Sequence, residues 1–288
     1  MKLSRFYELA IKYGRERDPR PRFKKGYADS AILCGEPDLE VKKILVGIDI
    51  EAPEILLADR LRQESGLDLV LAHHPEGRAL ARLSEVMAVQ ADILARAGFK
   101  RKAAKEFLEE RMQEVERRLL PQNHTRPVDA ARLLDLAFMC CHTPADNHAF
   151  WFISKLMKEK KPKTVQDIVS ILEDVPEYRQ AAKDCLGPRI ILGSPRRPAG
   201  KILVEMTGGT EGSKDIFEKL SSAGVRTLVS MHLSDEHLKR VKDANLNVVI
   251  AGHISSDTLG LNLLFDRISQ EEELQFIPCS GFKRIIRN

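Results

Sequence analysis

The chain of 288 residues is long enough for one large domain or two ordinary ones, and 43% hydrophobic with 31% charged residues is typical of a folded globular protein. A net charge of +4 is too small to indicate a dedicated nucleic-acid binder, so nucleic acid is not an expected partner. No apolar run approaches the roughly 20 residues that cross a bilayer, so no membrane is expected either. The five cysteines include no Cys-x-x-Cys pair, which favours a reducing compartment, and we expect the protein in the cytoplasm.

The first half of the chain contains a predicted strand, helix, strand unit. Residues 1–18 precede it and form an expected amphipathic helix, because charged residues interrupt their apolar pattern and no signal-peptide cleavage site follows. Apolar strands at 42–50 and 67–74 then flank an amphipathic helix at 51–66. A charged helical insertion is expected at about 78–130, and AFMCCH at 137–142 is a further predicted strand.

The second half repeats this pattern after a helical connector at 151–199. Strands are predicted at 200–209, 225–232 and 245–253, with a helix at 210–224. Both halves begin their first strand with Lys-Ile-Leu-Val and place a histidine after their second. We therefore predict an α/β fold with an internal duplication, in which two similar α/β lobes built from βαβ units occupy residues 1–150 and 200–288.

Four histidines directly follow apolar, strand-like runs. They are His73, His142, His232 and His253, and His74 doubles the first of them. In open α/β sheets, ligands bind beyond the carboxyl ends of the strands. One histidine at a strand end is ordinarily a structural residue, but several arriving at one edge of a sheet favour a metal site.

Two carboxylates accompany these histidines at helical spacing. Asp146 comes four residues after His142, and Asp257 comes four residues after His253, so each pair lies on one face of a helix that begins there. Imidazole nitrogens with carboxylate oxygens suit zinc, iron, manganese or nickel, and the lack of cysteine argues against a closed structural zinc site. Adjacent histidines and two carboxylates able to bridge favour two divalent metal ions about 3.5–4 Å apart.

The motifs AHHP, HTPAD and GHISSDTLG, in this order, resemble the NIF-three-like family of dinuclear-metal-centre proteins, often described as GTP cyclohydrolase I type 2 homologues. The resemblance covers roughly residues 40–77, 136–147 and 200–265. It implies a metal site in the cleft between two lobes, and a homo-oligomer, often a hexameric ring. It implies that His142 lies close to the site and that the metal ligands are His73, His74, Asp146, His253 and Asp257.

This sequence departs from the family pattern at two of these places. Asp257 stands where the family usually has Glu, which is one methylene longer and bridges two ions more easily. His232 stands where the family usually has Gly-Glu or Gly-Asp, and it adds or replaces a contact to the site. The interval that holds the charged helices is also long, so the oligomer can differ from the family's.

Several other residues allow either a functional or a purely structural interpretation. Glu76 is a general base beside the metals or a carboxylate that caps a turn, and Asp49 orients a ligand histidine or is an ordinary hydrogen-bonded carboxylate. Three glycines between a strand and a helix form an anion cradle or a tight turn; they are Gly208, Gly209 and Gly212. The other three histidines, His124, His148 and His237, are expected mostly in loops and at the surface.

The predicted function is metal-dependent hydrolysis of an amide, a cyclic amide or a phosphoester in an unknown small-molecule substrate. Activity like that of a GTP cyclohydrolase is implied by the resemblance alone. The alternative is a non-catalytic metal-binding protein with a regulatory or protein-interaction role, which the charged helical insertion favours.

Overall fold

The computed structural model describes residues 1–21 and 23–287; Arg22, in the basic run 15–25, lies outside them. The chain divides into two compact units that are each discontinuous in sequence. The first unit comprises Met1–Val86, Met112–His148 and Asp257–Asn288, and the second comprises Met87–Arg111 and Ala149–Ser256.

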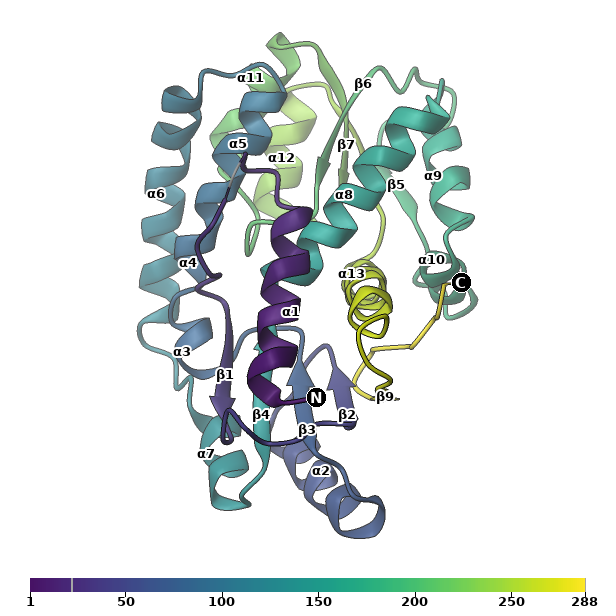
Figure 1. Ribbon diagram of the computed structural model, residues 1–288. Helices are drawn as coiled ribbons and strands as arrows, with labels where there is room; N and C mark the ends of the chain where they lie inside the picture. Colours follow the sequence, from purple (N-terminus) through teal and green to yellow (C-terminus); the bar gives the residue numbers. More distant parts are fainter. Residues whose placement is uncertain (22, 288) are drawn as a thin grey trace. The chain divides into compact units, whose positions relative to one another are not determined.

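The first unit contains a five-stranded sheet with the order β1-β4-β3-β2-β9 (Figure 1). β2, β3, β4 and β9 pair in parallel, and β1 is antiparallel to β4. The strands are β1 (Ser30–Cys34), β2 (Lys43–Gly47), β3 (Leu69–Ala72), β4 (Ala137–Cys141) and β9 (Gln275–Pro278). β3 and β4 are buried along their whole length, as expected of interior strands covered on both faces.

Helices pack on both faces of this sheet. Side chains alternate between the faces along each strand, so Ile44 joins one hydrophobic cluster and its neighbour Leu45 joins the other. Phe6 and Phe265 belong to the first cluster, and Ile55 belongs to the second. The helices of this unit are α1 (Leu3–Glu16), α2 (Ala52–Ser65), α3 (Gly77–Leu80), α4 (Leu83–Val86) and α7 (Arg126–Leu133), with most of α13 (His253–Ile268).

The second unit contains a four-stranded sheet with the order β5-β8-β7-β6. Its strands are β5 (Arg189–Leu192), β6 (Lys201–Glu205), β7 (Val225–Ser230) and β8 (Asn247–Ile250). β6, β7 and β8 are parallel and β5 is antiparallel to β8. Order and directions therefore repeat those of β1-β4-β3-β2, which confirms the predicted pair of similar α/β lobes. Strand β9 has no counterpart among the described strands of this sheet.

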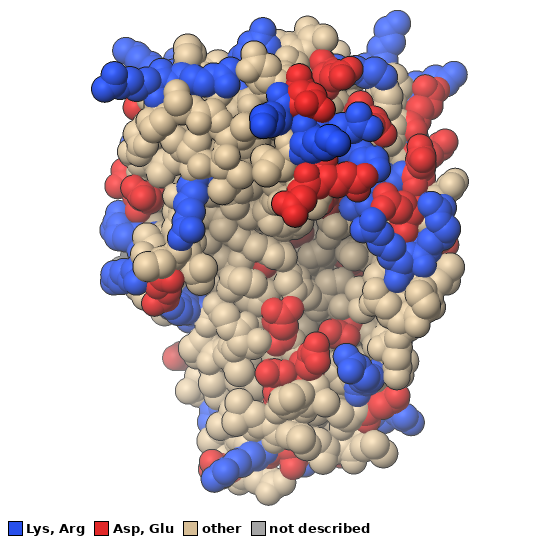
Figure 2. Space-filling view, turned by 180° about the vertical axis from the view of Figure 1, so that it is seen from behind, with Lys and Arg blue, Asp and Glu red and all other residues tan. Residues whose placement is uncertain are grey.

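The remaining helices are η1 (Met87–Val89), α5 (Gln90–Arg96), α6 (Arg101–Leu119), α8 (Thr143–Lys160), α9 (Val165–Glu173), α10 (Pro176–Lys183), η2 (Lys214–Ile216), α11 (Phe217–Ser222) and α12 (Asp235–Asp243). None of the helices in the described residues is both long and apolar enough to cross a membrane. On the face shown in Figure 2, Lys and Arg side chains are interspersed with Asp and Glu, as on an ordinary solvated surface.

The structure differs from the sequence predictions mainly at the edges of the sheets. Strands β1 and β5 were not predicted, because their apolar runs at 31–34 and 190–192 are short and both edge strands are only partly buried. The helix expected at 210–224 is shortened to η2 and α11 behind a glycine-rich turn. Residues 200–288 were assigned to one lobe, whereas β9 pairs with β2, so residues from Asp257 onward group with the first unit.

Candidate metal centre

The end of β3 explains how two adjacent histidines reach one site. The strand ends at Ala72, but the next backbone N–H groups continue the ladder: His73 donates to the carbonyl of Gly47 at 2.8 Å, and His74 donates to that of Ile48 at 3.0 Å. The two rings then lie 5.3 Å apart, tilted by 44°. The His73 side chain is fully buried and that of His74 is 25% exposed, so His73 lies deeper in the site.

The end of β4 adds a third imidazole. His142 follows the strand directly and α8 begins at the next residue, so Asp146 lies in the first turn of that helix. The His142 ring centroid is 4.9 Å from that of His73 and 5.8 Å from that of His74. The ends of two parallel strands thus bring His73, His74 and His142 together as predicted, whereas His232 and His253 follow strands of the second sheet.

Two buried carboxylates face these imidazoles. Asp257 Oδ1 lies 3.5 Å from His73 Nε2, and its Oδ2 lies 3.5 Å from His74 Nε2. Asp146 Oδ1 lies 3.3 Å from His73 Nε2, and its Oδ2 lies 3.6 Å from Nε2 of His142. Each carboxylate therefore spans two histidines, and ligand atoms of His73, Asp146 and Asp257 all lie within 4.8 Å of one another.

All three imidazoles are held by Nδ1, which directs Nε2 toward the carboxylates. The Nδ1 contacts are the carbonyl oxygen of Cys141 for His73 at 3.2 Å, Asp49 Oδ1 for His74 at 2.6 Å and Asp29 Oδ2 for His142 at 2.9 Å. Histidines that bind metals ordinarily donate their second ring N–H to a carbonyl or a carboxylate in this way. Asp49 thus contacts His74 in the manner of an orienting carboxylate, and the same contact is that of an ordinary hydrogen-bonded aspartate.

Two buried atoms of the cluster test whether these residues fit a metal ion. Among the described residues, His73 Nε2 and Asp146 Oδ1 have no hydrogen-bond partner, although they lie 3.3 Å apart. A buried polar atom without a partner is destabilising by about 1–3 kcal/mol, and such atoms are few in native proteins. A divalent cation that accepts a lone pair from each would satisfy both, so the donor set fits one.

The electrostatics of the cluster favour positive charge. Burial lowers the pKa of His73, but the Asp257 and Asp146 carboxylates outweigh this effect and raise it to about 10. Burial likewise lowers the pKa of His74, while Asp257 and Asp49 raise it to about 9. Without metal, both imidazoles hold protons at neutral pH, so metal binding releases protons.

Glu76 lies two residues after His74 and is half-buried. Burial, followed by the charge of Glu51, raises the pKa of the Glu76 carboxyl to about 7. A carboxyl group with this pKa exchanges protons readily near neutral pH, which suits a general base or acid.

His253 and His232 belong to the second unit, where their ring centroids are 4.8 Å apart. His253 begins α13 and Asp257 is one turn later, as the four-residue spacing predicted. Ser255 and Ser256 are residues of a type that often caps a helix N-terminus, but here they lie inside the first turn of α13. His232 Nδ1 lies 3.4 Å from Oε1 of Glu211.

The glycine-rich turn that contains Gly208, Gly209 and Gly212 directs its polar groups into the protein. The Gln90 Nε2 donates to the carbonyl oxygens of Gly208 at 3.0 Å and Thr210 at 2.7 Å, and the Gly212 N–H donates to Glu205 Oε1 at 3.2 Å. Gly208 and Gly209 have φ of 111° and 81°, which favours glycine. These contacts favour the tight-turn interpretation over an anion cradle.

Two other histidines do not lie where the sequence placed them. His148 and His237 are only 3% and 4% exposed, since both face inward from helices, and His124 is half-buried.

Asp29 is a residue of the site that the sequence interpretation missed. It is fully buried, and besides holding His142 it accepts a hydrogen bond from the Thr143 hydroxyl at 2.5 Å. It lies before an unpredicted edge strand, and no motif marks it.

The fold and these motifs can be compared with known proteins. No protein-family model and no curated protein sequence matches the chain. A solved NIF3 superfamily protein from Sphaerobacter thermophilus is 25% identical, with a TM-score of 0.81 and 98% of each chain covered. Reduced HcgD from Methanocaldococcus jannaschii is 14% identical, with a TM-score of 0.60, 96% of this chain and 97% of that chain covered. A protein from Thermus thermophilus is also 14% identical, with a TM-score of 0.53 and the same coverage.

The last two similarities, at 14% identity, concern the fold alone, whereas the first reaches 25% identity with a TM-score of 0.81, and this chain adds the cluster of strand-end histidines. The resemblance seen in AHHP, HTPAD and GHISSDTLG is thereby confirmed, and the chain is a NIF3-superfamily protein with a buried His/Asp cluster able to bind metal.

Proposed function

We propose that the protein binds two divalent metal ions, of zinc, iron, manganese or nickel, and is a metal-dependent hydrolase. The observation that carries this proposal is the convergence of three Nε2 atoms and two carboxylates, with each imidazole fixed through Nδ1. The donor types fit these metals, and the absence of cysteine from the cluster distinguishes it from a structural zinc site.

The two oxygens of Asp257 support a bridging role, because one faces His73 and the other faces His74. His73 and Asp146 would hold one ion, and His142 is placed to join them through Nε2. His74 would hold the second ion. We assign His253 to the same ion because it lies four residues before Asp257 in α13, so that both side chains lie on one face of the helix.

Bound divalent ions would supply Lewis acidity and lower the pKa of a water molecule toward neutrality. The protein would supply the proton acceptor: Glu76, half-buried two residues after His74, would take the proton of the attacking water and return it to the leaving group. Asp49 and Asp29 keep the imidazoles in the tautomer that leaves Nε2 able to accept an ion.

The substrate classes that we propose are an amide, a cyclic amide and a phosphoester. GTP is one substrate to test, because the family resemblance implies ring opening of a purine. We also propose a cytoplasmic homo-oligomer, for which a hexameric ring is the first arrangement to test by light scattering.

The first test is metal content by elemental mass spectrometry on protein purified without a metal-affinity tag. We expect about two ions per chain, and loss of both in a His73→Ala, His253→Ala double variant. The control is His124→Ala, which removes a half-buried loop histidine outside the cluster. Metal retained in the double variant would contradict the assigned ligands.

The second test separates a hydrolase from a metal-binding regulatory protein. Glu76→Gln should keep its metal but lower kcat by roughly 100-fold, because only the proton acceptor is lost. Activity should vanish with a chelator and return on adding metal. Two bound ions without chelator-sensitive hydrolysis of any substrate class named above would favour the regulatory alternative.

A further inference from the structure

The two similar sheets differ at one edge. In the first sheet β9 pairs in parallel with β2, from Lys43 with Gln275 to Val46 with Pro278. In the second sheet the corresponding strand β6 is the edge strand, and within the described residues no strand pairs with its open side. Both β2 and β6 begin with Lys-Ile-Leu-Val, so the same strand sequence is covered in one unit and open in the other.

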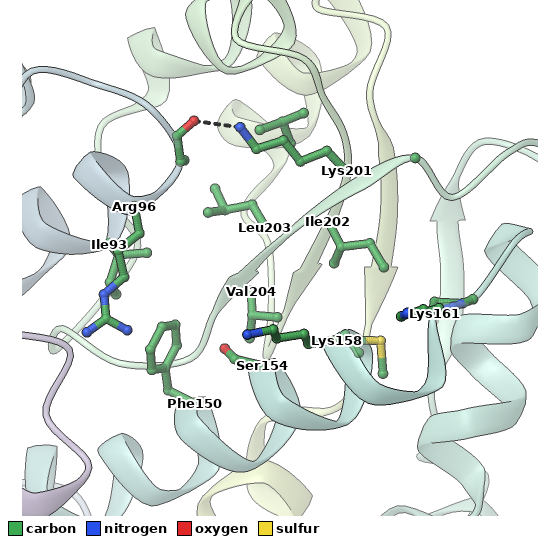
Figure 3. A pocket seen from close by; sticks show the side chains of 15 residues that line it. Ile93, Arg96, Phe150, Ser154, Lys158, Lys161, Lys201, Ile202, Leu203 and Val204 are labelled. Atoms are coloured by element: carbon green, nitrogen blue, oxygen red, sulfur yellow. Dashed lines mark hydrogen bonds between the residues drawn. The ribbon is translucent and has the colours of Figure 1, made fainter.

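A cavity of about 480 Å³ lies along this open edge (Figure 3). Four consecutive residues of β6, from Lys201 to Val204, line it. Because successive side chains of a strand point to opposite faces, a cavity that touches all four reaches the strand's edge, and it also extends over one face as far as Val225 of β7. Residues from α5 and α8 form the other walls, among them Ile93, Arg96, Phe150, Ser154 and Lys158. We call this cavity the β6 groove.

The β6 groove is apolar within and basic at its rim. Ile93, Phe150 and Met157 contribute apolar surface, and four basic residues but no acidic residue are among those that line it. Lys158 and Lys161 are exposed, and within the described part of the chain neither has a carboxylate oxygen within 4.0 Å. Such a groove is complementary to a chain that carries negative charge.

We propose that the β6 groove binds an extended, acidic peptide segment of a partner protein, which adds to the second sheet as a fifth strand parallel to β6. Strand addition at a sheet edge takes its affinity from main-chain hydrogen bonds and its specificity from the side chains beside the edge. In the first sheet these bonds run from the N–H of Gln275 to the Lys42 carbonyl and from that of Cys279 to the Val46 carbonyl, both at 2.8 Å.

Because β2 and β6 share the sequence Lys-Ile-Leu-Val, we assign the same register to a strand that pairs with β6. Gly200 and Val204 then correspond to Lys42 and Val46. Backbone groups at alternate residues of β6 then pair with the incoming strand, as in any parallel ladder. Carboxylates of the partner segment pair with Lys158 and Lys161 at the rim, and its apolar side chains contact Ile93 and Phe150.

The chain itself supplies a suitable probe. The peptide EEELQFIP, residues 271–278, contains three glutamates followed by β9, which already pairs with Lys-Ile-Leu-Val in the first sheet. A fluorescently labelled synthetic copy, added to the intact protein, should bind with an affinity measurable by anisotropy. Hydrogen exchange should then slow at the amides of residues 201–206, where the new strand forms.

Charge variants test the rim. Lys158→Glu with Lys161→Asn should weaken binding of the probe roughly tenfold, and a probe with its glutamates replaced by lysine should bind as poorly. Asparagine is used at Lys161 because this residue has φ of 48°, a conformation that asparagine tolerates. The matched control changes two exposed lysines of α12, Lys239→Glu with Lys242→Asn, and should leave binding unchanged.

A backbone variant distinguishes strand addition from simple anion binding. Ile202→Pro removes a backbone N–H that, in the proposed register, points outward from the open edge of β6. Edge strands tolerate proline at such a position, so the variant should weaken binding of the probe without unfolding the protein. If this variant does not fold, the exchange measurement on the unaltered protein decides. No binding, binding without slower exchange at 201–206, or complete displacement of the probe by inorganic phosphate would overturn the proposal.

Discussion

Apart from the additional strand β9, the two sheets have the same strand order and directions, yet they present different chemistry at their strand ends. A strand of each sheet is followed by a histidine and, four residues later, by an aspartate in the first turns of a helix: His142 and Asp146 after β4, His253 and Asp257 after β8. In the first unit the buried carboxylate of Asp29 holds Nδ1 of its histidine, whereas His253 lies against the ring of His232. The comparison indicates that topology places the imidazoles, whereas the groups that contact Nδ1 determine which ring nitrogen remains available to a ligand.

The largest expected effect comes from exchanging the two helix-start aspartates for alanine. Asp257→Ala should release both ions, because its oxygens face His73 and His74, while Asp146→Ala should release one. Each loss should lower metal affinity at least about 100-fold. Elemental mass spectrometry on folded variants, checked by circular dichroism, measures this. Equal loss in the two variants would show that Asp257 does not bridge.

Asp29→Asn should have the next largest effect. It keeps the shape of the side chain but weakens its bonds to His142 and to the Thr143 hydroxyl, so we expect about 2 kcal/mol of lost stability. Metal affinity should also fall 10- to 100-fold, because His142 loses its orienting partner. The control Asp92→Asn disrupts a buried carboxylate paired with Arg101 at 2.9 Å and should change stability alone. Equal metal affinity in both variants would contradict the role of Asp29.

The sequence predicted the parts of this molecule that depend on continuous apolar strands. The interior strands β3 and β4 consist entirely of buried residues, so their ends, and the histidines there, could be located from the pattern alone. The edge strands β1 and β5 could not, because their apolar runs, at 31–34 and 190–192, are too short to establish a strand by periodicity and are only partly buried. Asp29 was missed for the same reason, since it precedes β1 and is joined to His142 only through the antiparallel pairing of β1 with β4.

Two buried histidines of the first unit lie in opposite electrostatic surroundings. Carboxylates raise the pKa of His73, whereas burial, with the charges of Arg17 and Arg267, lowers the pKa of His148 to about 3. Unfolding returns His148 to a pKa near 6.5, so the unfolded chain binds more protons between those values. Stability contributed by neutral His148 is therefore complete above about pH 6.5 and is lost as the pH falls toward 3.

The measurement is chemical denaturation of the unaltered protein and of His148→Gln over this pH range. The unaltered protein should lose up to about 1.4 kcal/mol per pH unit more than the variant, because glutamine does not titrate. Metal should be removed from both samples, so that the cluster contributes equally. Parallel losses of stability would show that His148 is not held neutral in the folded protein.

The smallest expected effect concerns the turns that follow the two Lys-Ile-Leu-Val strands. After β2 the chain enters α2 through a cap, in which the Glu51 N–H donates to Glu54 Oε2 at 2.9 Å. After β6 the turn is instead held by Gln90, so Gln90→Ala should reduce stability by about 1–2 kcal/mol by leaving the carbonyls of Gly208 and Thr210 without their donor. Inorganic phosphate should not raise the melting temperature of either protein, because the Gly212 N–H is already used by Glu205. Stabilisation by phosphate that disappears in Gln90→Ala would instead make this turn the anion cradle, and the two units would then differ in ligand as well as in structure.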